Sequence, residues 1–111
     1  MTTVAAVQMI STPDVGQNIA TAGKLVSEAA ARGAVLVTLP EYWPIMGMSD
    51  TDKVAHAEPD GDGPIQRFMA TAAREHRIWL VGGTLPLQSG DPDKVMNTTL
   101  VYNPQGERVV R

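Results

Sequence analysis

The sequence predicts an α/β fold with a mixed sheet, and three observations lead to this class. Apolar runs of strand length occupy residues 4–10, 34–40 and 78–86. Segments with apolar residues at the helical spacing of three and four follow the first two of these runs. Two short β-patterns flank the turn sequence Asn103–Gly106, which indicates an antiparallel hairpin. A strand–helix–strand unit has parallel strands and a right-handed crossover, whereas a hairpin has antiparallel strands. The predicted sheet therefore contains both parallel and antiparallel pairing.

The chain has 111 residues, which is the usual size of one domain, and we treat residues 1–111 as a single domain. Its residues are 43% hydrophobic and 19% charged, which is typical of globular proteins and not of disordered ones. The formal net charge of −3 offers no basic surface to nucleic acid or to an anionic membrane. No apolar run could span a bilayer, and the N-terminus does not resemble a signal peptide. We therefore expect a cytoplasmic protein that binds neither nucleic acid nor membrane.

The first strand–helix–strand unit explains most of residues 4–40. A strand over residues 4–10 precedes a helix whose N-cap is either Ser11 or Asp14. Gly33 ends this helix, and Pro40 ends the hydrogen bonding of the second strand. The apolar stripe of the helix consists of Val15, Ile19, Ala22, Val26 and Ala29.

The next segment, residues 42–63, has no regular period, and such long loops are often functional or contain short helical pieces. Its acidic residues do not have the spacing of a calcium loop, and we interpret them, like His56, as solvated. These acidic residues are Asp50, Asp52, Glu58, Asp60 and Asp62. We expect His76, near the end of the following helix, to complement the helix dipole. The sequence thus indicates no metal site and no cofactor.

A second helix begins at Gly63-Pro64 and ends near residues 76–77. It leads into the third strand, in which we expect Trp79 to lie in the core. Gly82-Gly83 interrupts this strand, and the pair either lets the backbone approach a ligand closely or marks a bulge.

The candidate functional residue is Glu41, in the sequence "LPEYW" just after the second strand. In open α/β sheets ligands bind outside the carboxyl ends of parallel strands. Tyr42 and Trp43 follow directly, and partial desolvation by these aromatics would make the carboxylate a better general base. The alternative is that Glu41 is a solvated loop residue, and the physics of this segment alone leaves both interpretations open. A nucleotide site is disfavoured, because no glycine-rich phosphate loop follows the first strand.

Four motifs along the chain resemble the N-terminal portion of the nitrilase superfamily, the carbon–nitrogen hydrolases. They are "VAAVQM", "GAVLVTLPEYW", "VGGTLP" and "NTTLVYNPQGE", in family order and over nearly the whole chain. The combination is most similar to the branch that contains deaminated glutathione amidase. The resemblance implies a four-layer α-β-β-α sandwich and a homo-oligomer that acts on a small-molecule amide or nitrile substrate.

The resemblance also implies a glutamate–lysine–cysteine mechanism, with Glu41 at the position of the general base. Tyr42 and Trp43 would then lie on the wall of the substrate pocket. The chain has no cysteine, which also excludes a disulfide framework and a thiolate metal site in it. None of Lys24, Lys53 and Lys94 falls at the family's lysine position. We therefore expect the N-terminal portion of an amidase, inactive alone; the alternative is a noncatalytic α/β association module.

Overall fold

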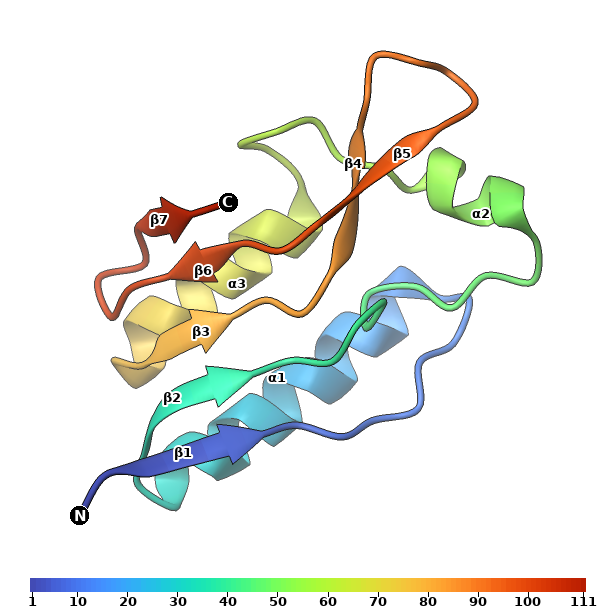
Figure 1. The fold of residues 1–111 in the computed structure, drawn as a ribbon. Coiled ribbons are helices and arrows are strands. Elements are labelled where there is room, and N and C mark those ends of the chain that lie inside the picture. The colour runs from blue at the N-terminus through green and yellow to red at the C-terminus, as the bar shows by residue number, and fades with distance from the viewer.

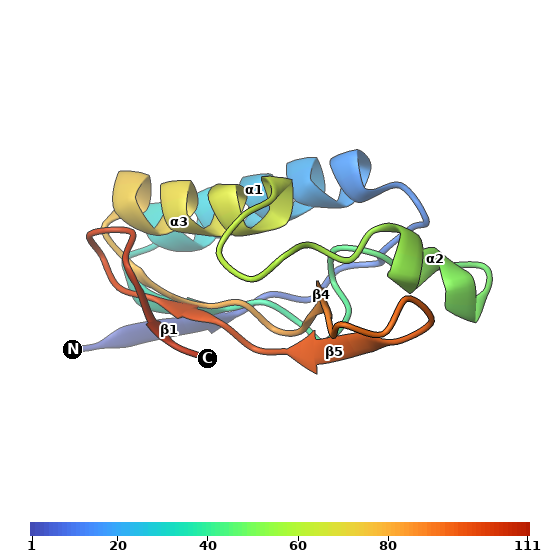
Figure 2. The same cartoon turned by 90° about the horizontal axis from the view of Figure 1, so that it is seen from above.

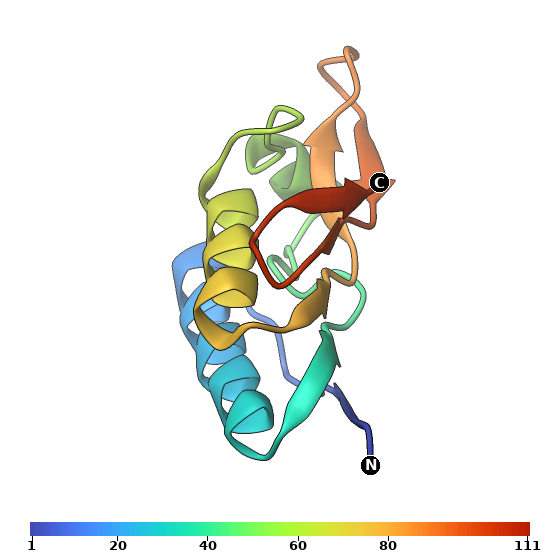
Figure 3. The same cartoon turned by 90° about the vertical axis from the view of Figure 1, so that its left-hand side faces the viewer.

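The computed structural model describes the backbone of residues 1–111 and every side chain except that of Asp50. Two long helices, α1 (Val15–Ala31) and α3 (Pro64–His76), lie side by side on one face of a five-stranded sheet (Figures 1 and 2). A short helix, α2 (Asp50–Ala55), lies beside a separate two-stranded ribbon. Seen from the side, the helices form one layer and the sheet a second, with the core between them (Figure 3).

The sheet is mixed, as the sequence predicts, in the order β1-β2-β3-β6-β7. Three strands are parallel, namely β1 (Thr3–Ala6), β2 (Ala34–Thr38) and β3 (Trp79–Val81). Two more pair antiparallel at one edge, namely β6 (Val101–Tyr102) and β7 (Arg108–Val110). The ribbon consists of β4 (Leu85–Gln88) and β5 (Val95–Thr98), so the long run at residues 78–86 divides between two sheets at its two glycines.

Of the two predicted N-caps of α1, Asp14 is confirmed. Its carboxylate accepts a hydrogen bond from the backbone N–H of Gln17 at 3.0 Å, which satisfies one of the free donors of the first turn. Ser11 has another role, because its hydroxyl donates to the carbonyl of Trp43 at 2.8 Å. The helix ends at Ala31 and is followed by Gly33 in the left-handed region, with φ +91°.

Helix α3 has the predicted start and end. Pro64 occupies its first position, where a missing N–H costs nothing, and Arg77 follows its last residue in the left-handed conformation. His76 lies in the last turn, where a positive charge suits the dipole. No helix of the described chain combines the length and hydropathy that crossing a membrane requires.

The loop between β2 and α3 contains the short helix α2, in line with the prediction of helical pieces. The interpretation of Glu58 as solvated is wrong. Its side chain is buried, and its carboxylate accepts hydrogen bonds from the backbone N–H groups of Ile65 at 2.6 Å and Gln66 at 3.1 Å. A carboxylate is stable there because it satisfies free donors at the positive end of the α3 dipole.

Asp60, in the same loop, pairs with the guanidinium groups of Arg108 and Arg111 near β7. The hydrogen bond from Arg108 is the main reason that the pKa of Asp60 lies below its ordinary value. This pair therefore connects the loop before α3 to the edge strand of the sheet.

The two faces of the sheet differ in their surroundings. Val37, Leu80 and Tyr102 are paired neighbours that face the helices and are buried. Their neighbours along the strands, including Leu36 and Trp79, point to the opposite face because side chains alternate along a strand. The prediction that Trp79 lies in the core is therefore wrong, and this side chain is 43% exposed.

The helix-free side, which we call the open face, is apolar. By register it contains Val4, Ala6, Leu36, Trp79, Val81, Val101 and Val110, together with the hydroxyl residue Thr38. The predicted sandwich has two helix layers and two sheet layers, and the chain contributes one of each (Figure 2). In such a sandwich the open face is where a second sheet packs.

Candidate active site

Glu41 lies just beyond the carboxyl end of β2, at the edge of the sheet where β1 and β3 also end (Figure 1). The chain continues past the strand in register, because the N–H of Leu39 donates to the carbonyl of Val81 at 2.9 Å. Pro40 then ends the ladder, since it has no N–H to donate. The sequence therefore places Glu41 at the predicted strand end, on a loop anchored to the neighbouring strand.

Hydrogen bonds from distant segments hold the residues that follow Glu41. The N–H of Tyr42 donates to the hydroxyl oxygen of Thr84 at 2.8 Å. The indole N–H of Trp43 donates to the carbonyl of Gly82, also at 2.8 Å. Asn18, buried on α1, donates its amide to the carbonyl of Pro44 at 2.8 Å. Because α1 and the segment after β3 both contribute, the loop is fixed from two sides.

Gly83 makes the close approach of these segments possible. Its φ is +58°, and a Cβ at this position would lie 2.0 Å from the carbonyl oxygen of Pro40. Any side chain would therefore push the loop of Glu41 away from the segment after β3. Gly83 thus lets two backbone segments of the protein approach each other closely. An approach of this segment to a ligand, one of the two roles considered for Gly82-Gly83, stays a prediction.

The carboxylate of Glu41 is exposed, and none of the described side chains donates a hydrogen bond to it. The partial burial expected from its aromatic neighbours is therefore wrong for these 111 residues. The reason is the direction of Trp43, which turns into the core, has no exposed surface and packs against Phe68 at a ring-centroid distance of 5.6 Å. This burial also corrects the prediction that Trp43 lines a substrate pocket.

Tyr42 remains at the surface beside Glu41. It is half-buried, and the ammonium of Lys53 on α2 lies 3.7 Å from the centre of its ring, within the range of a cation–π contact. Its φ of +55° is unusual for a residue with a side chain. Residues in sparsely populated backbone regions cluster at functional sites, where the surrounding structure enforces them.

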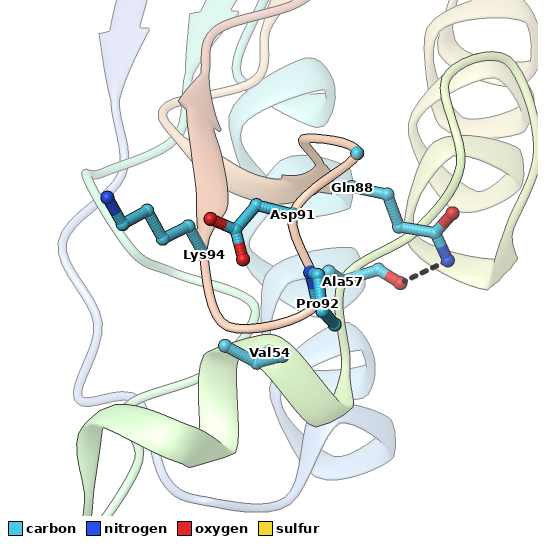
Figure 4. Close-up of a pocket in the computed structure, with 7 residues that line it drawn as sticks. Val54, Ala57, Gln88, Asp91, Pro92 and Lys94 are labelled. Carbon is cyan, nitrogen blue, oxygen red and sulfur yellow. Dashed lines mark hydrogen bonds between the residues drawn. The ribbon is translucent and has the colours of Figure 1, made fainter.

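A hollow of about 310 Å³ lies elsewhere, between α2 and the turn that joins β4 to β5 (Figure 4). Val54 lies on its α2 side, and Asp91, Pro92 and Lys94 belong to the turn. Glu41 is not among the residues that line it.

Within the described side chains, no group of three His, Asp or Glu residues could hold a metal ion. His56 is exposed at the C-cap of α2, as the sequence predicts.

Sequence reasoning missed the residues that hold the Glu41 loop, namely Ser11, Asn18 and Thr84. The glycine pair before Thr84 was the available signal, because two adjacent glycines in a strand indicate a close backbone approach. Nothing in the sequence indicates which segment approaches them.

Comparison with known proteins identifies the family. A sequence model described as carbon–nitrogen hydrolase matches residues 3–111. The chain is 34% identical to the chloroplastic omega-amidase of Arabidopsis thaliana over 103 residues, which are 90% of this chain and 27% of that protein. It is 31% identical over 108 residues to deaminated glutathione amidase of Synechocystis, covering 96% of this chain and 39% of the relative.

Solved structures give the same result. The fold matches Nit3 of Saccharomyces cerevisiae with a TM-score of 0.78 at 27% identity, over 90% of this chain and 38% of that one. It matches the NitFhit protein of C. elegans with a TM-score of 0.80 at 26% identity, over 97% and 27% of the two chains. The chain thus spans well under half the length of these relatives. Its sequence and its fold show that it belongs to the carbon–nitrogen hydrolase family of the nitrilase superfamily, in the branch that includes deaminated glutathione amidase.

Proposed function

We propose that residues 1–111 provide the general base of an amidase, and that this base is Glu41. The observation that carries the proposal is the contrast between the backbone around Glu41 and the carboxylate of Glu41. The residues after Glu41 are held because Tyr42 and Trp43 donate hydrogen bonds to Thr84 and Gly82 and because Pro44 accepts one from Asn18. The carboxylate itself accepts none from the described side chains and can act on another group. A glutamate that stabilises the fold bonds its oxygens within the protein, as Glu58 does.

The proposed reaction needs a thiol and a lysine from a part of the protein outside this chain. Glu41 accepts the thiol proton, and the thiolate attacks the carbonyl carbon of a small linear amide. The lysine stabilises the oxyanion, and ammonia leaves after protonation by the glutamic acid. Glu41 then takes a proton from water, and the hydroxide attacks the thioester carbon. The carbon–sulfur bond breaks to release the carboxylic acid, and the thiolate takes the proton back from Glu41, which restores the thiol and the carboxylate.

The segment that supplies the thiol would also exclude water from Glu41. A carboxylate open to solvent is a weak base, and covering it would increase its basicity. Tyr42, half-buried beside Glu41, would form part of the substrate wall. The 111-residue chain has no cysteine, so we expect it to release no ammonia from amides on its own.

The experiment that tests this proposal is Glu41→Gln in the full-length hydrolase, with ammonia release as the readout. We expect kcat to fall by at least about 10²- to 10⁴-fold, the usual contribution of a general base. The circular dichroism spectrum should not change, because no described group bonds to this carboxylate. Glu107→Gln, at another exposed glutamate, is the matched control and should retain activity. Wild-type turnover in the Glu41 variant would contradict the proposal.

The substrate class is tested by a panel of small amides and the nitriles with the same acyl group. We expect hydrolysis of the amides. If only the nitriles were hydrolysed, the chain would belong to a nitrilase and not to an amidase.

A second candidate function is association, and the open face of the sheet favours it. Apolar surfaces of this kind are rare on monomers and usually mark contacts with another polypeptide. We propose that this face packs against a second sheet and that the protein is a homo-oligomer. Analytical ultracentrifugation of the 111-residue chain should show self-association that Trp79→Lys weakens. A monomer at all concentrations would contradict a role in association.

A further inference from the structure

The backbone of Tyr42 has a conformation that is unusual for a residue with a side chain. Among the residues that the structure describes, two other than glycine have a positive φ, Tyr42 at +55° and Arg77 at +53°. Arg77 follows the end of α3, where the left-handed conformation is common. Tyr42 ends no helix, and its side chain makes the conformation less favourable than glycine would. A contact with the surrounding structure must therefore keep Tyr42 in this conformation.

The hydroxyl of Thr84 provides that contact. It accepts the hydrogen bond from the N–H of Tyr42 at 2.8 Å, across 42 positions of sequence. Thr84 follows directly after Gly83, whose missing side chain lets this segment lie against the carbonyl of Pro40. The residues on both sides of Glu41 are thus in contact with one short segment, Gly83-Thr84.

We propose that Thr84 is a positioning residue for Glu41. Its hydroxyl fixes the peptide that follows Glu41, and the close contact with Gly83 fixes the peptide that precedes it. The Cα–Cβ bond of Glu41 therefore has one direction relative to the sheet. This inference rests on the proposed function, because the direction matters only if the carboxylate must meet a thiol. A displacement of about 1 Å at such a group can reduce the rate by roughly 100-fold.

The test compares Thr84→Val with Thr84→Ser in the full-length hydrolase. Valine keeps the shape of threonine but cannot accept the hydrogen bond, whereas serine can. We expect kcat to fall by about 10- to 100-fold in Thr84→Val, with KM changed less than about threefold, and serine to restore most of kcat. Thr71→Val removes a hydroxyl from a half-buried threonine of α3 and is the matched control. If Thr84→Val does not fold, Thr84→Ala takes its place with the same expectation.

A second measurement separates positioning from simple stabilisation. Hydrogen exchange of the Tyr42 amide should be slow in the wild-type chain and in Thr84→Ser, and fast in Thr84→Val. All rates are measured well below the midpoint of thermal unfolding of each variant. A Thr84→Val enzyme that loses thermal stability but keeps its kcat would overturn the inference.

The activity of Glu41→Gln distinguishes a failure of the positioning role from a failure of the proposed function. If Glu41→Gln is inactive while Thr84→Val has normal kcat, the positioning role fails and the proposed function stands. If Glu41→Gln is fully active, the proposed function fails, and the positioning role fails with it whatever the exchange rate of the Tyr42 amide.

Discussion

Two glutamates, Glu41 and Glu58, occupy loops on either side of α2, and the protein uses them in opposite ways. Glu58 is buried, and both its oxygens accept hydrogen bonds at the start of α3. Glu41 is exposed and its carboxylate has no described donor, yet the backbone around it is tightly held. A structural carboxylate is thus recognised by the groups that its oxygens contact. A catalytic candidate is recognised by a rigid backbone that presents free oxygens.

The variant with the largest expected effect on stability, Glu58→Ala, tests the structural half of this comparison. It leaves the N–H groups of Ile65 and Gln66 buried without an acceptor and opens a cavity, so we expect a loss of roughly 2–4 kcal/mol in the free energy of unfolding. Urea denaturation measures this loss. Glu107→Ala, at an exposed glutamate, should change the same quantity by less than about 0.5 kcal/mol. Equal effects of the two variants would show that Glu58 is not a structural carboxylate.

Substitutions of the two tryptophans should have effects of intermediate size on the free energy of unfolding. Trp43→Phe removes the hydrogen bond to the carbonyl of Gly82 and reduces packing in the core, which should cost about 1–3 kcal/mol. Trp79→Phe, on the open face, should cost less than about 0.5 kcal/mol in the 111-residue chain at concentrations low enough to keep it monomeric. Thermal unfolding of both variants checks the difference, and acrylamide should quench the fluorescence of Trp79 more strongly than that of Trp43. A similar loss in both would contradict the assignment of Trp43 to the core.

The smallest expected effect on stability is that of Asp60. Its carboxylate is not buried like that of Glu58, and unlike that of Glu41 it has described hydrogen-bond donors. The hydrogen bond from Arg108 lowers its pKa in the folded state, so its contribution to stability is present above the ordinary value of 3.8. That contribution disappears as the pH falls through the lowered pKa. The midpoint of thermal unfolding of the wild type should therefore exceed that of Asp60→Asn at pH 6. The gap should shrink below pH 3.8 and in high salt; a gap independent of pH would contradict this account.

The sequence is enough to predict the elements that depend on local patterns. The proline start of α3 and the hairpin around Asn103–Gly106 follow from residues close together in the chain, and so does the cap of α1, which the sequence narrows to Ser11 or Asp14. The family and the position of Glu41 also follow, because the motifs that carry them are contiguous.

Features that depend on distant partners could not be predicted in this way. Trp43 and Trp79 look alike in an apolar context. The pairing of β3 with β2 places Trp79 on the open face, whereas the bond to the carbonyl of Gly82 and the packing on Phe68 place Trp43 in the core. Glu58 looks solvated among acidic neighbours until α3 places two free N–H groups beside it. The exposure of Glu41 likewise depends on whether another segment covers it, and none of the described segments of residues 1–111 does so.

The contact between Tyr42 and Thr84 has a consequence for the order of events during synthesis. When the first strand–helix–strand unit leaves the ribosome, the glutamate is already present, but the residue that orients its loop lies more than forty positions further along the chain. The geometry around the carboxylate is therefore completed late, when β3 and the residues after it have emerged and docked. A nascent chain that stopped before that point would carry the acid without its alignment.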